Sequence, residues 1–237
     1  MKTVRAPRAL GLDCAWEIDR PLAEWFVKHG FRYALRYIDR TYPGRGGPSW
    51  LQYLSKEELA TLLDAGMGVG LVQRAKFHGR ELLCAEYGRE MGRNAALNLH
   101  KLDIPGGVTV WCDAEWTDEP TPLQIRDYLN GWSSVVKSEG FKPGLYVGAG
   151  CAPPLTAEAL YKLPRFKSYW QSVSQVQNVA TRGYGLVQSW EYVLRGTKPE
   201  TWRLQTMTSE NKTKGRRFDL DMSHIDALGG RWYMVGS

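Results

Sequence analysis

The chain has 237 residues, of which 43% are hydrophobic, 12% aromatic and 24% charged, and its formal net charge is +6. This composition excludes a disordered, collagen-like or coiled-coil protein, and the length suits one domain over residues 1–237 with a substantial core. The positive charge favours anionic partners, whether nucleic acid, anionic glycan or phospholipid, without choosing among them. No apolar run is long enough to cross a bilayer, so we expect no membrane insertion.

In the first half of the chain, short apolar strands alternate with amphipathic helices. Strands are expected at residues 9–14, 31–38, 67–73 and 108–116, and helices at 21–29, from Ser55 onward and at about 82–102. Glu58 stands three residues after Ser55, which is the pattern of a helix capping box.

The second half continues the alternation. A helix is expected from 121 to about 139, a strand at 143–148, a helix at 156–163 and a strand at 166–172. Residues 185–191, 201–207 and 216–222 look extended, and 223–229 suggests a short final helix. About eight strands with helices between most of them predict an α/β fold of the TIM type, a (β/α)8 barrel. A doubly wound open sheet is the alternative, although no GxGxxG motif follows any strand.

Acidic residues gather at the ends of the expected strands. Asp113 and Glu115 lie two apart in VTVWCDAEW, so they share a face at the carboxyl end of that strand, where barrel active sites are built. Asp13 closes the first strand, and Asp219 and Asp221 share a face in RRFDLDM. We expect these acids to meet at one mouth, where repulsion raises the pKa of at least one enough for a general acid. Paired carboxyl groups beside a glycosidic bond are the usual glycosidase arrangement.

Each of these acids also has a structural interpretation, in which it caps a helix or pairs with an arginine. Rim carboxylates can also bind Mg²⁺ or Ca²⁺. The four cysteines and four histidines are scattered, and no phosphate-binding loop is present. We therefore predict no metal and no cofactor.

Aromatic residues accompany the expected strand ends, among them Tyr37, Trp116, Tyr146 and Trp170. Sugar rings stack on aromatic planes, so an acidic mouth lined by Tyr and Trp suits a carbohydrate, although any one of these residues could equally be a core residue. Tyr146 in GLYVG is the strongest candidate, because its hydroxyl at a strand end could orient a substrate group.

Together, GLD, RYI, DAE, GLYVG and FDLDM give the chain a family resemblance. Their order over residues 11–232 resembles the glycoside hydrolase family 25 lysozymes, and more closely their relatives in the glycoside-hydrolase-like group called domain of unknown function 1906. The resemblance implies a TIM-type barrel that cleaves the glycosidic bond between N-acetylmuramic acid and N-acetylglucosamine in peptidoglycan.

The resemblance also implies roles for the acids. Glu115 would be the general acid and base, and Asp113 would orient the acetamido group whose oxygen attacks the anomeric carbon, a substrate-assisted retaining mechanism. Asp13 and Asp219 would position that pair. Asp221 stands where related lysozymes often have Asn, and we assign it to substrate binding.

We expect a monomer whose partner is peptidoglycan or a related glycan, and no binding of nucleic acid, because the basic residues are spread along the chain. The first twenty residues lack the apolar stretch of a signal peptide. We therefore expect the protein to be made in the cytoplasm and to act at the bacterial cell wall after release or delivery, as a phage lysin or a secreted effector would. A catalytically inactive glycan-binding or structural barrel is the alternative function.

Overall fold

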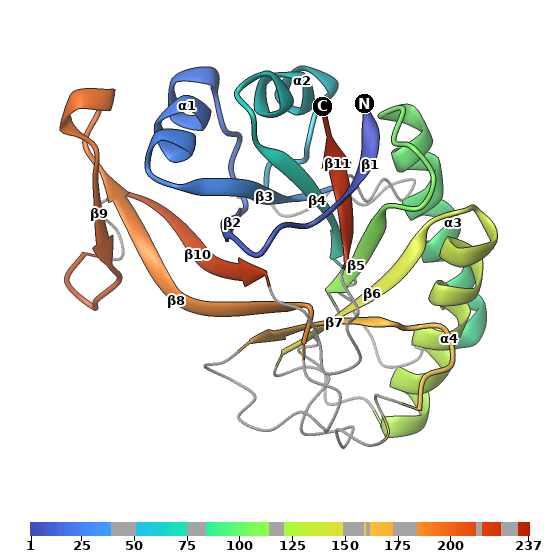
Figure 1. The fold of residues 1–237 in the computed structure, drawn as a ribbon. Helices are drawn as coiled ribbons and strands as arrows, with labels where there is room; N and C mark the ends of the chain where they lie inside the picture. Colours follow the sequence, from blue (N-terminus) through green and yellow to red (C-terminus); the bar gives the residue numbers. More distant parts are fainter. Residues whose placement is uncertain are drawn as a thin grey trace.

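Figure 1 shows the computed structural model, which describes residues 1–38, 51–74, 84–113, 121–148, 159, 162–172, 184–211, 215–223 and 232–237. The strands are β1 (Lys2–Arg5), β2 (Leu10–Cys14), β3 (Phe31–Tyr37), β4 (Gly68–Arg74), β5 (Thr109–Asp113), β6 (Lys142–Val147), β7 (Ser168–Ser172), β8 (Leu186–Arg195), β9 (Arg203–Thr206), β10 (Arg216–Ser223) and β11 (Tyr233–Gly236). The helices are α1 (Arg20–Lys28), α2 (Lys56–Asp64), α3 (Ala85–Lys101), α4 (Pro122–Ser138) and the short 3-10 helix η2 (Pro199–Thr201).

Eight strands close into a barrel in the order β4, β3, β2, β10, β8, β7, β6 and β5, with β5 pairing back to β4. The predicted TIM-type barrel is thus confirmed. One strand departs from the (β/α)8 pattern, because β10 runs antiparallel to both of its neighbours, β2 and β8. The reason is local: β8 is a long strand that continues beyond the barrel, and the chain pairs back on it first as β9 and then as β10. Both pairings are antiparallel, and antiparallel neighbours need no crossover helix.

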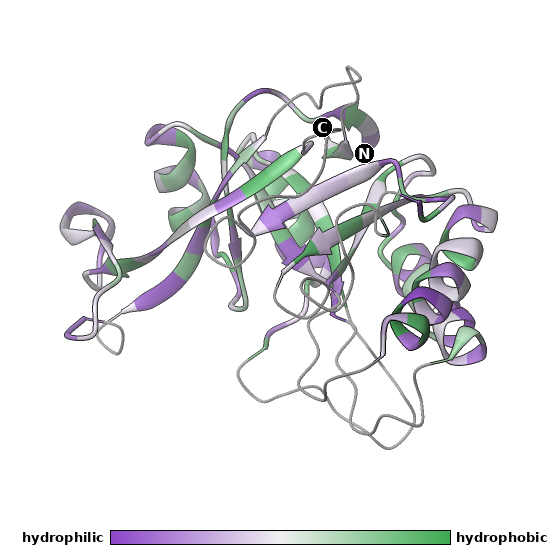
Figure 2. Ribbon diagram, turned by 90° about the horizontal axis from the view of Figure 1, so that it is seen from below, coloured by the Kyte–Doolittle hydropathy of each residue, from purple (hydrophilic) through white to green (hydrophobic). Residues whose placement is uncertain are grey.

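The outward faces of the barrel strands pack against the helices. Val110 and Cys112 of β5 and Leu145 of β6 are buried in this outer core, as the alternation of side chains along a strand requires. The helices are amphipathic, with hydrophobic and hydrophilic residues interleaved along each, whereas the projecting β8–β9–β10 ribbon is largely hydrophilic at its far end (Figure 2).

The inside of the barrel is filled by large aromatic side chains. Tyr33, Trp111, Trp170 and Trp232 are all buried there, and their rings contact one another edge to face. Glycine makes room for them, since a Cβ atom at Gly11 would overlap the ring of Tyr33. The interior is therefore a packed core below the mouth rather than a channel.

Two strands that the sequence did not predict close the opposite end of the barrel. β1 and β11 pair with each other antiparallel, and β11 also pairs with the start of β4 through Val235 and Val69. The backbone N–H of Tyr233 donates to the hydroxyl of Thr109 on β5 at 3.0 Å, so β11 wedges between β4 and β5. Both termini lie at this end (Figure 1), which leaves the other end, where the parallel strands finish, for the candidate site.

No helix in the described part of the chain combines the length and apolarity needed to cross a membrane. The helices expected at 156–163 and 223–229 fall largely outside the described residues.

Candidate active site

The carboxyl ends of the parallel strands bring predicted site residues together. Asp13 is the second-to-last residue of β2, and Asp113 is the last residue of β5. Tyr146 of β6 lies opposite Asp113 in the β5–β6 pairing. Asp219 lies opposite Asp13 in the β2–β10 pairing. The hydroxyl of Tyr37, the last residue of β3, donates to Oδ2 of Asp113 at 3.4 Å. Five of the predicted site residues, Tyr37 included, are thus arranged around the mouth.

A residue that sequence reasoning missed joins this group. Gln188 of β8 points inward, and its amide Nε2 donates to Oδ2 of Asp13 at 2.7 Å and to Oδ2 of Asp219 at 3.0 Å. Its amide oxygen accepts from the Tyr146 hydroxyl at 2.7 Å. Gln188 of β8 therefore connects two acids and one tyrosine from three other strands. Its position in the extended segment GLVQSWE was the available signal, since alternate residues of a barrel strand face inward.

Asp221 and Trp170 lie in the floor of the site rather than on its surface. Because β10 runs antiparallel, Asp221 is two residues deeper than Asp219, opposite Gly11, and is completely buried. Trp170 is 1% exposed, its indole N–H donates to Oδ1 of Asp221 at 2.9 Å, and its ring packs on Tyr146 with centroids 4.4 Å apart. The prediction that all the acids meet at the rim is therefore wrong for Asp221, which lies below it. Trp170 is buried and presents no face on which a sugar could stack.

Burial and mutual repulsion disturb the protonation of two acids. Burial raises the pKa of Asp13 well above its usual value, and the nearby charges of Asp219, Asp221 and Asp113 raise it further, while the hydrogen bond from Gln188 opposes them. Burial and then Asp219 likewise raise the pKa of Asp221. Burial and the neighbouring charges therefore favour the protonated forms of these two carboxyl groups.

Two predicted residues, Glu115 and Trp116, lie outside the described residues. They follow Asp113 by two and three positions in the chain. Within the described residues, no group of three or more His, Cys, Asp or Glu side chains is arranged to hold a metal ion.

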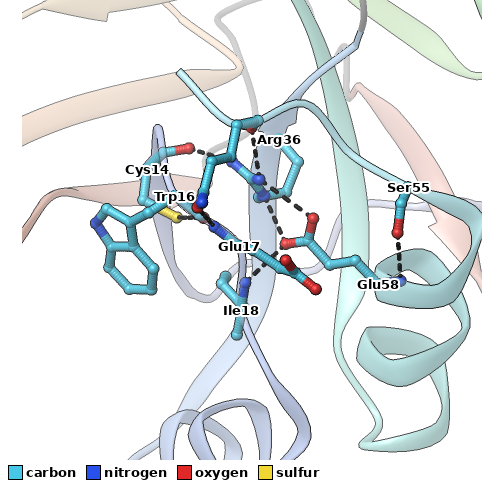
Figure 3. Close-up of polar contacts among 8 residues, drawn as sticks. Cys14, Trp16, Glu17, Ile18, Arg36, Ser55 and Glu58 are labelled. Atoms are coloured by element: carbon cyan, nitrogen blue, oxygen red, sulfur yellow. Dashed lines mark hydrogen bonds and ion pairs between the residues drawn. The ribbon is translucent and has the colours of Figure 1, made fainter. Parts of the chain in front are cut away.

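The segment that follows β2 is held by a buried ion pair (Figure 3). Arg36 of β3 donates from Nε to Oε1 of Glu58 at 2.7 Å and from Nη2 to Oε2 at 3.2 Å, with both side chains fully buried. The same guanidinium donates to the backbone carbonyls of Cys14 and Gln52. Oε1 of Glu58 also accepts from the backbone N–H of Ile18 at 2.9 Å. The ion pair thus fixes the chain on both sides of residues 15–17.

This ion pair corrects the predicted capping box. The hydroxyl of Ser55 accepts from the backbone N–H of Glu58 at 3.0 Å, as expected for the N-cap residue that precedes α2. The carboxylate of Glu58 turns instead to Arg36 and Ile18, so the second half of the box is wrong. A buried arginine without an anionic partner would cost more free energy than a helix end that lacks its second cap.

The mouth opens into a pocket of about 450 Å³ on the side of the β8–β10 ribbon. Asp13, Asp219 and Tyr37 line it together with Trp16, from the segment held by Arg36. Glu191 of β8 lies opposite Asp219 in register and is a further acid of the pocket, which the sequence analysis did not single out. The pocket thus extends the acidic mouth away from the barrel axis.

Comparison with known proteins decides the family. Residues 23–225 match the family described as Rv2525c-like, glycoside hydrolase-like domain. The chain belongs to this family. The family resemblance expected from the motifs is confirmed, together with its relation to glycoside hydrolase family 25. A comparison with curated proteins gives no match.

Solved structures with the same fold include members of both groups. The Tat-secreted protein Rv2525c of Mycobacterium tuberculosis, in complex with L-tartrate, is 16% identical with a TM-score of 0.63, over 95% of this chain and 100% of that chain. A glycosyl hydrolase 25 of Streptococcus pneumoniae, the virulence factor GHIP, is 10% identical with a TM-score of 0.53, over 94% and 88%. The modular autolysin LytC of S. pneumoniae, in complex with a synthetic peptidoglycan ligand, is 9% identical with a TM-score of 0.51, over 91% of this chain and 46% of LytC.

The localisation expected from the sequence is wrong. The expectation was a product without a signal peptide, made in the cytoplasm. The structurally similar family member of M. tuberculosis is a Tat-secreted protein, and Tat export depends on a signal peptide.

Proposed function

We propose that this glycoside-hydrolase-like domain cleaves peptidoglycan at the bond between N-acetylmuramic acid and N-acetylglucosamine. The observation that carries the proposal is the linked pair Asp13 and Asp219, joined through Gln188, next to Asp113 at the mouth of the barrel. Hydrolysis of a glycosidic bond needs carboxyl groups in different protonation states at one place, and burial of Asp13 supplies the conditions for that difference.

In the proposed mechanism Glu115 donates a proton to the glycosidic oxygen as the bond to the leaving sugar breaks. The carbonyl oxygen of the substrate's own acetamido group attacks the anomeric carbon, and the carboxylate of Asp113 accepts a hydrogen bond from the acetamido N–H, which becomes more acidic as positive charge develops. Water then attacks the same carbon, and Glu115 takes up its proton. The anomeric configuration is retained because the carbon is attacked twice.

Other residues hold this arrangement in place. The Tyr37 hydroxyl donates to Asp113, which orients the carboxylate toward the mouth. Asp13 and Asp219 shape the negative field that stabilises developing positive charge at the anomeric carbon. The similarity of the fold to that of LytC, whose structure was solved with a synthetic peptidoglycan ligand, supports the choice of substrate.

The test is release of new reducing ends from purified peptidoglycan by the wild type and by Glu115→Gln, with Glu210→Gln as the matched control because Glu210 is exposed far along the ribbon. We expect Glu115→Gln to lose a hundredfold or more, roughly the contribution of a general acid, and Glu210→Gln to match the wild type. Equal activity of Glu115→Gln and wild type would show that another group supplies the proton.

A second candidate function rests on the hydrogen bonds within the site. Asp13, Asp221, Gln188 and Tyr146 are buried and bonded to one another or to Trp170, as in a polar network that supports a glycan-binding barrel without catalysis. In that case the wild type binds glycan fragments in calorimetric titration while no wall of any type releases reducing ends.

A further inference from the structure

The pocket beside the mouth combines negative and positive ends. Asp13, Asp219 and Glu191 line its inner part, and Arg216 and Arg217 line its outer part where β10 enters the barrel. The change of sign occurs along a single strand, because Arg216 and Arg217 precede Asp219 by three and two residues. At about 3.3 Å per residue, the backbone positions of the two arginines lie about 7–10 Å from that of Asp219 along β10.

Trp16 gives the positive end a defined geometry. Its indole N–H donates to the backbone carbonyl of Arg217 at 2.6 Å, which fixes the ring against β10. The guanidinium of Arg216 lies over this ring, with Cζ 5.4 Å from the centroid, within the range of a cation–π contact. The ring itself is carried on the segment that Arg36 and Glu58 hold, and it points away from that ion pair (Figure 3).

The charges at this end are available to a ligand. Among the described residues, neither Arg216 nor Arg217 forms an ion pair with a carboxylate, and both side chains are exposed. A guanidinium near an aromatic ring still has N–H groups that can donate to a ligand, and an arginine can form two parallel hydrogen bonds with one carboxylate. Two exposed arginines that have no carboxylate partner among the described residues, in a pocket that is otherwise acidic, are electrostatically suited to a ligand with a negative group at one end only.

We propose that Arg216 and Arg217 form an anion subsite that determines specificity, and that it receives the carboxylate of a short acidic peptide carried by the sugar bound at Asp13 and Asp219. An extended peptide spans about 3.3–3.6 Å per residue, so two or three residues cover the separation between the two ends. The inference rests on the proposed function, since it assumes that the sugar occupies the mouth. It distinguishes a peptide-substituted glycan from a neutral one such as an oligomer of N-acetylglucosamine.

The experiment measures binding and cleavage separately. Calorimetric titration uses N-acetylmuramoyl dipeptide with free carboxylates and the same compound with its carboxylates amidated, against wild type, the double variant Arg216→Gln/Arg217→Gln and the control Arg195→Gln. Arg195 is an exposed arginine on the same ribbon that does not line the pocket. In parallel, reducing-end release is measured on peptide-bearing peptidoglycan and on N-acetylglucosamine oligomers.

We expect the wild type and Arg195→Gln to prefer the free carboxylate by about tenfold, the scale of one charge-assisted hydrogen bond, and the double variant to lose that preference. The loss should appear in KM for peptide-bearing substrate and not in kcat. If the wild type cleaves peptidoglycan and the double variant still prefers the free carboxylate as strongly as the wild type, the subsite is overturned and the proposed function stands. Binding that depends on the two arginines without any cleavage would overturn the hydrolase proposal and leave the subsite standing, whereas no binding and no cleavage would overturn both.

Discussion

Replacing Arg36 by methionine should destabilise the protein strongly, because the buried guanidinium donates to four acceptor atoms. Two are the carboxylate oxygens of Glu58 and two are the backbone carbonyls of Cys14 and Gln52. Methionine retains most of the apolar stem, so the packing changes little, and the main effect is the loss of the charge and its donors.

The size of the effect follows from what is left behind. Removing one partner of a buried ion pair costs about 3–5 kcal/mol, since the other charge stays buried without compensation. Both side chains are fully buried, so solvent relieves little of that cost. For a chain of this length each kcal/mol lowers Tm by about 2–4 °C, which gives a fall of roughly 6–20 °C for Arg36→Met.

The assay is urea unfolding of wild type, Arg36→Met, Glu58→Met and the double variant, followed by tryptophan fluorescence. The double variant should be more stable than the sum of the two single effects predicts, because removing both charges leaves no isolated ion. Arg20→Met serves as control: its ion pair with Asp64, at 3.2 Å, is exposed and should contribute less than about 1 kcal/mol. A single variant within about 1 kcal/mol of wild type, or strictly additive effects, would show that the ion pair does not hold this segment.

Three further predictions concern the interior of the barrel. Burial raises the pKa of Asp221, so the folded protein keeps a proton that the unfolded chain releases, and wild-type stability should fall as the pH rises from the usual carboxyl range through the raised pKa. Asp221→Asn should remove this fall, so the urea midpoint of the variant should gain on that of the wild type from acidic to neutral pH. Parallel curves of urea midpoint against pH for the two proteins would contradict the assignment. Gln188→Leu leaves Asp13 and Asp219 without their shared donor, so it should lower the free energy of unfolding in urea by about 2 kcal/mol and remove most glycan-cleaving activity. Tyr146→Phe removes one hydrogen bond and should lower the free energy of unfolding by about 1 kcal/mol. Equal losses of stability in the two variants would mean that Gln188 has no bridging role. Gly11→Ala should cost about 3 kcal/mol through overlap with the ring of Tyr33, and a Tyr33→Leu background should relieve most of that loss in the same measurement.

The barrel was predictable from the sequence because its signals are local. Alternating apolar residues in VTVWCDAEW indicated a strand with Val110 and Cys112 outward, and both lie in the outer core. Helices were expected to start at Ser55, from a capping pattern, and at residue 121, and Ser55 and Thr121 are the N-cap residues of α2 and α4. The acids at strand ends followed from the same periodicity, as Asp13, Asp113 and Asp219 at the mouth show.

The features that sequence reasoning missed depend on contacts between distant segments. β1 and β11 are four-residue strands at opposite ends of the chain, and they form by pairing with each other and, for β11, with β4. Strand direction is likewise not encoded in alternation, so RRFDLDM was placed correctly by face while the depth of Asp221 was not. Glu58 matched a local capping pattern, and the buried charge of Arg36, 22 residues earlier, overrode that pattern.

The most direct measurement is digestion of purified peptidoglycan in water labelled with heavy oxygen, followed by mass spectrometry of the fragments. A glycoside hydrolase adds one labelled oxygen at the new reducing end of muramic acid, and we expect this label with the wild type and not with Glu115→Gln. Label in a peptide carboxyl group, or no new ends from any type of wall, would contradict glycosidic cleavage by this barrel.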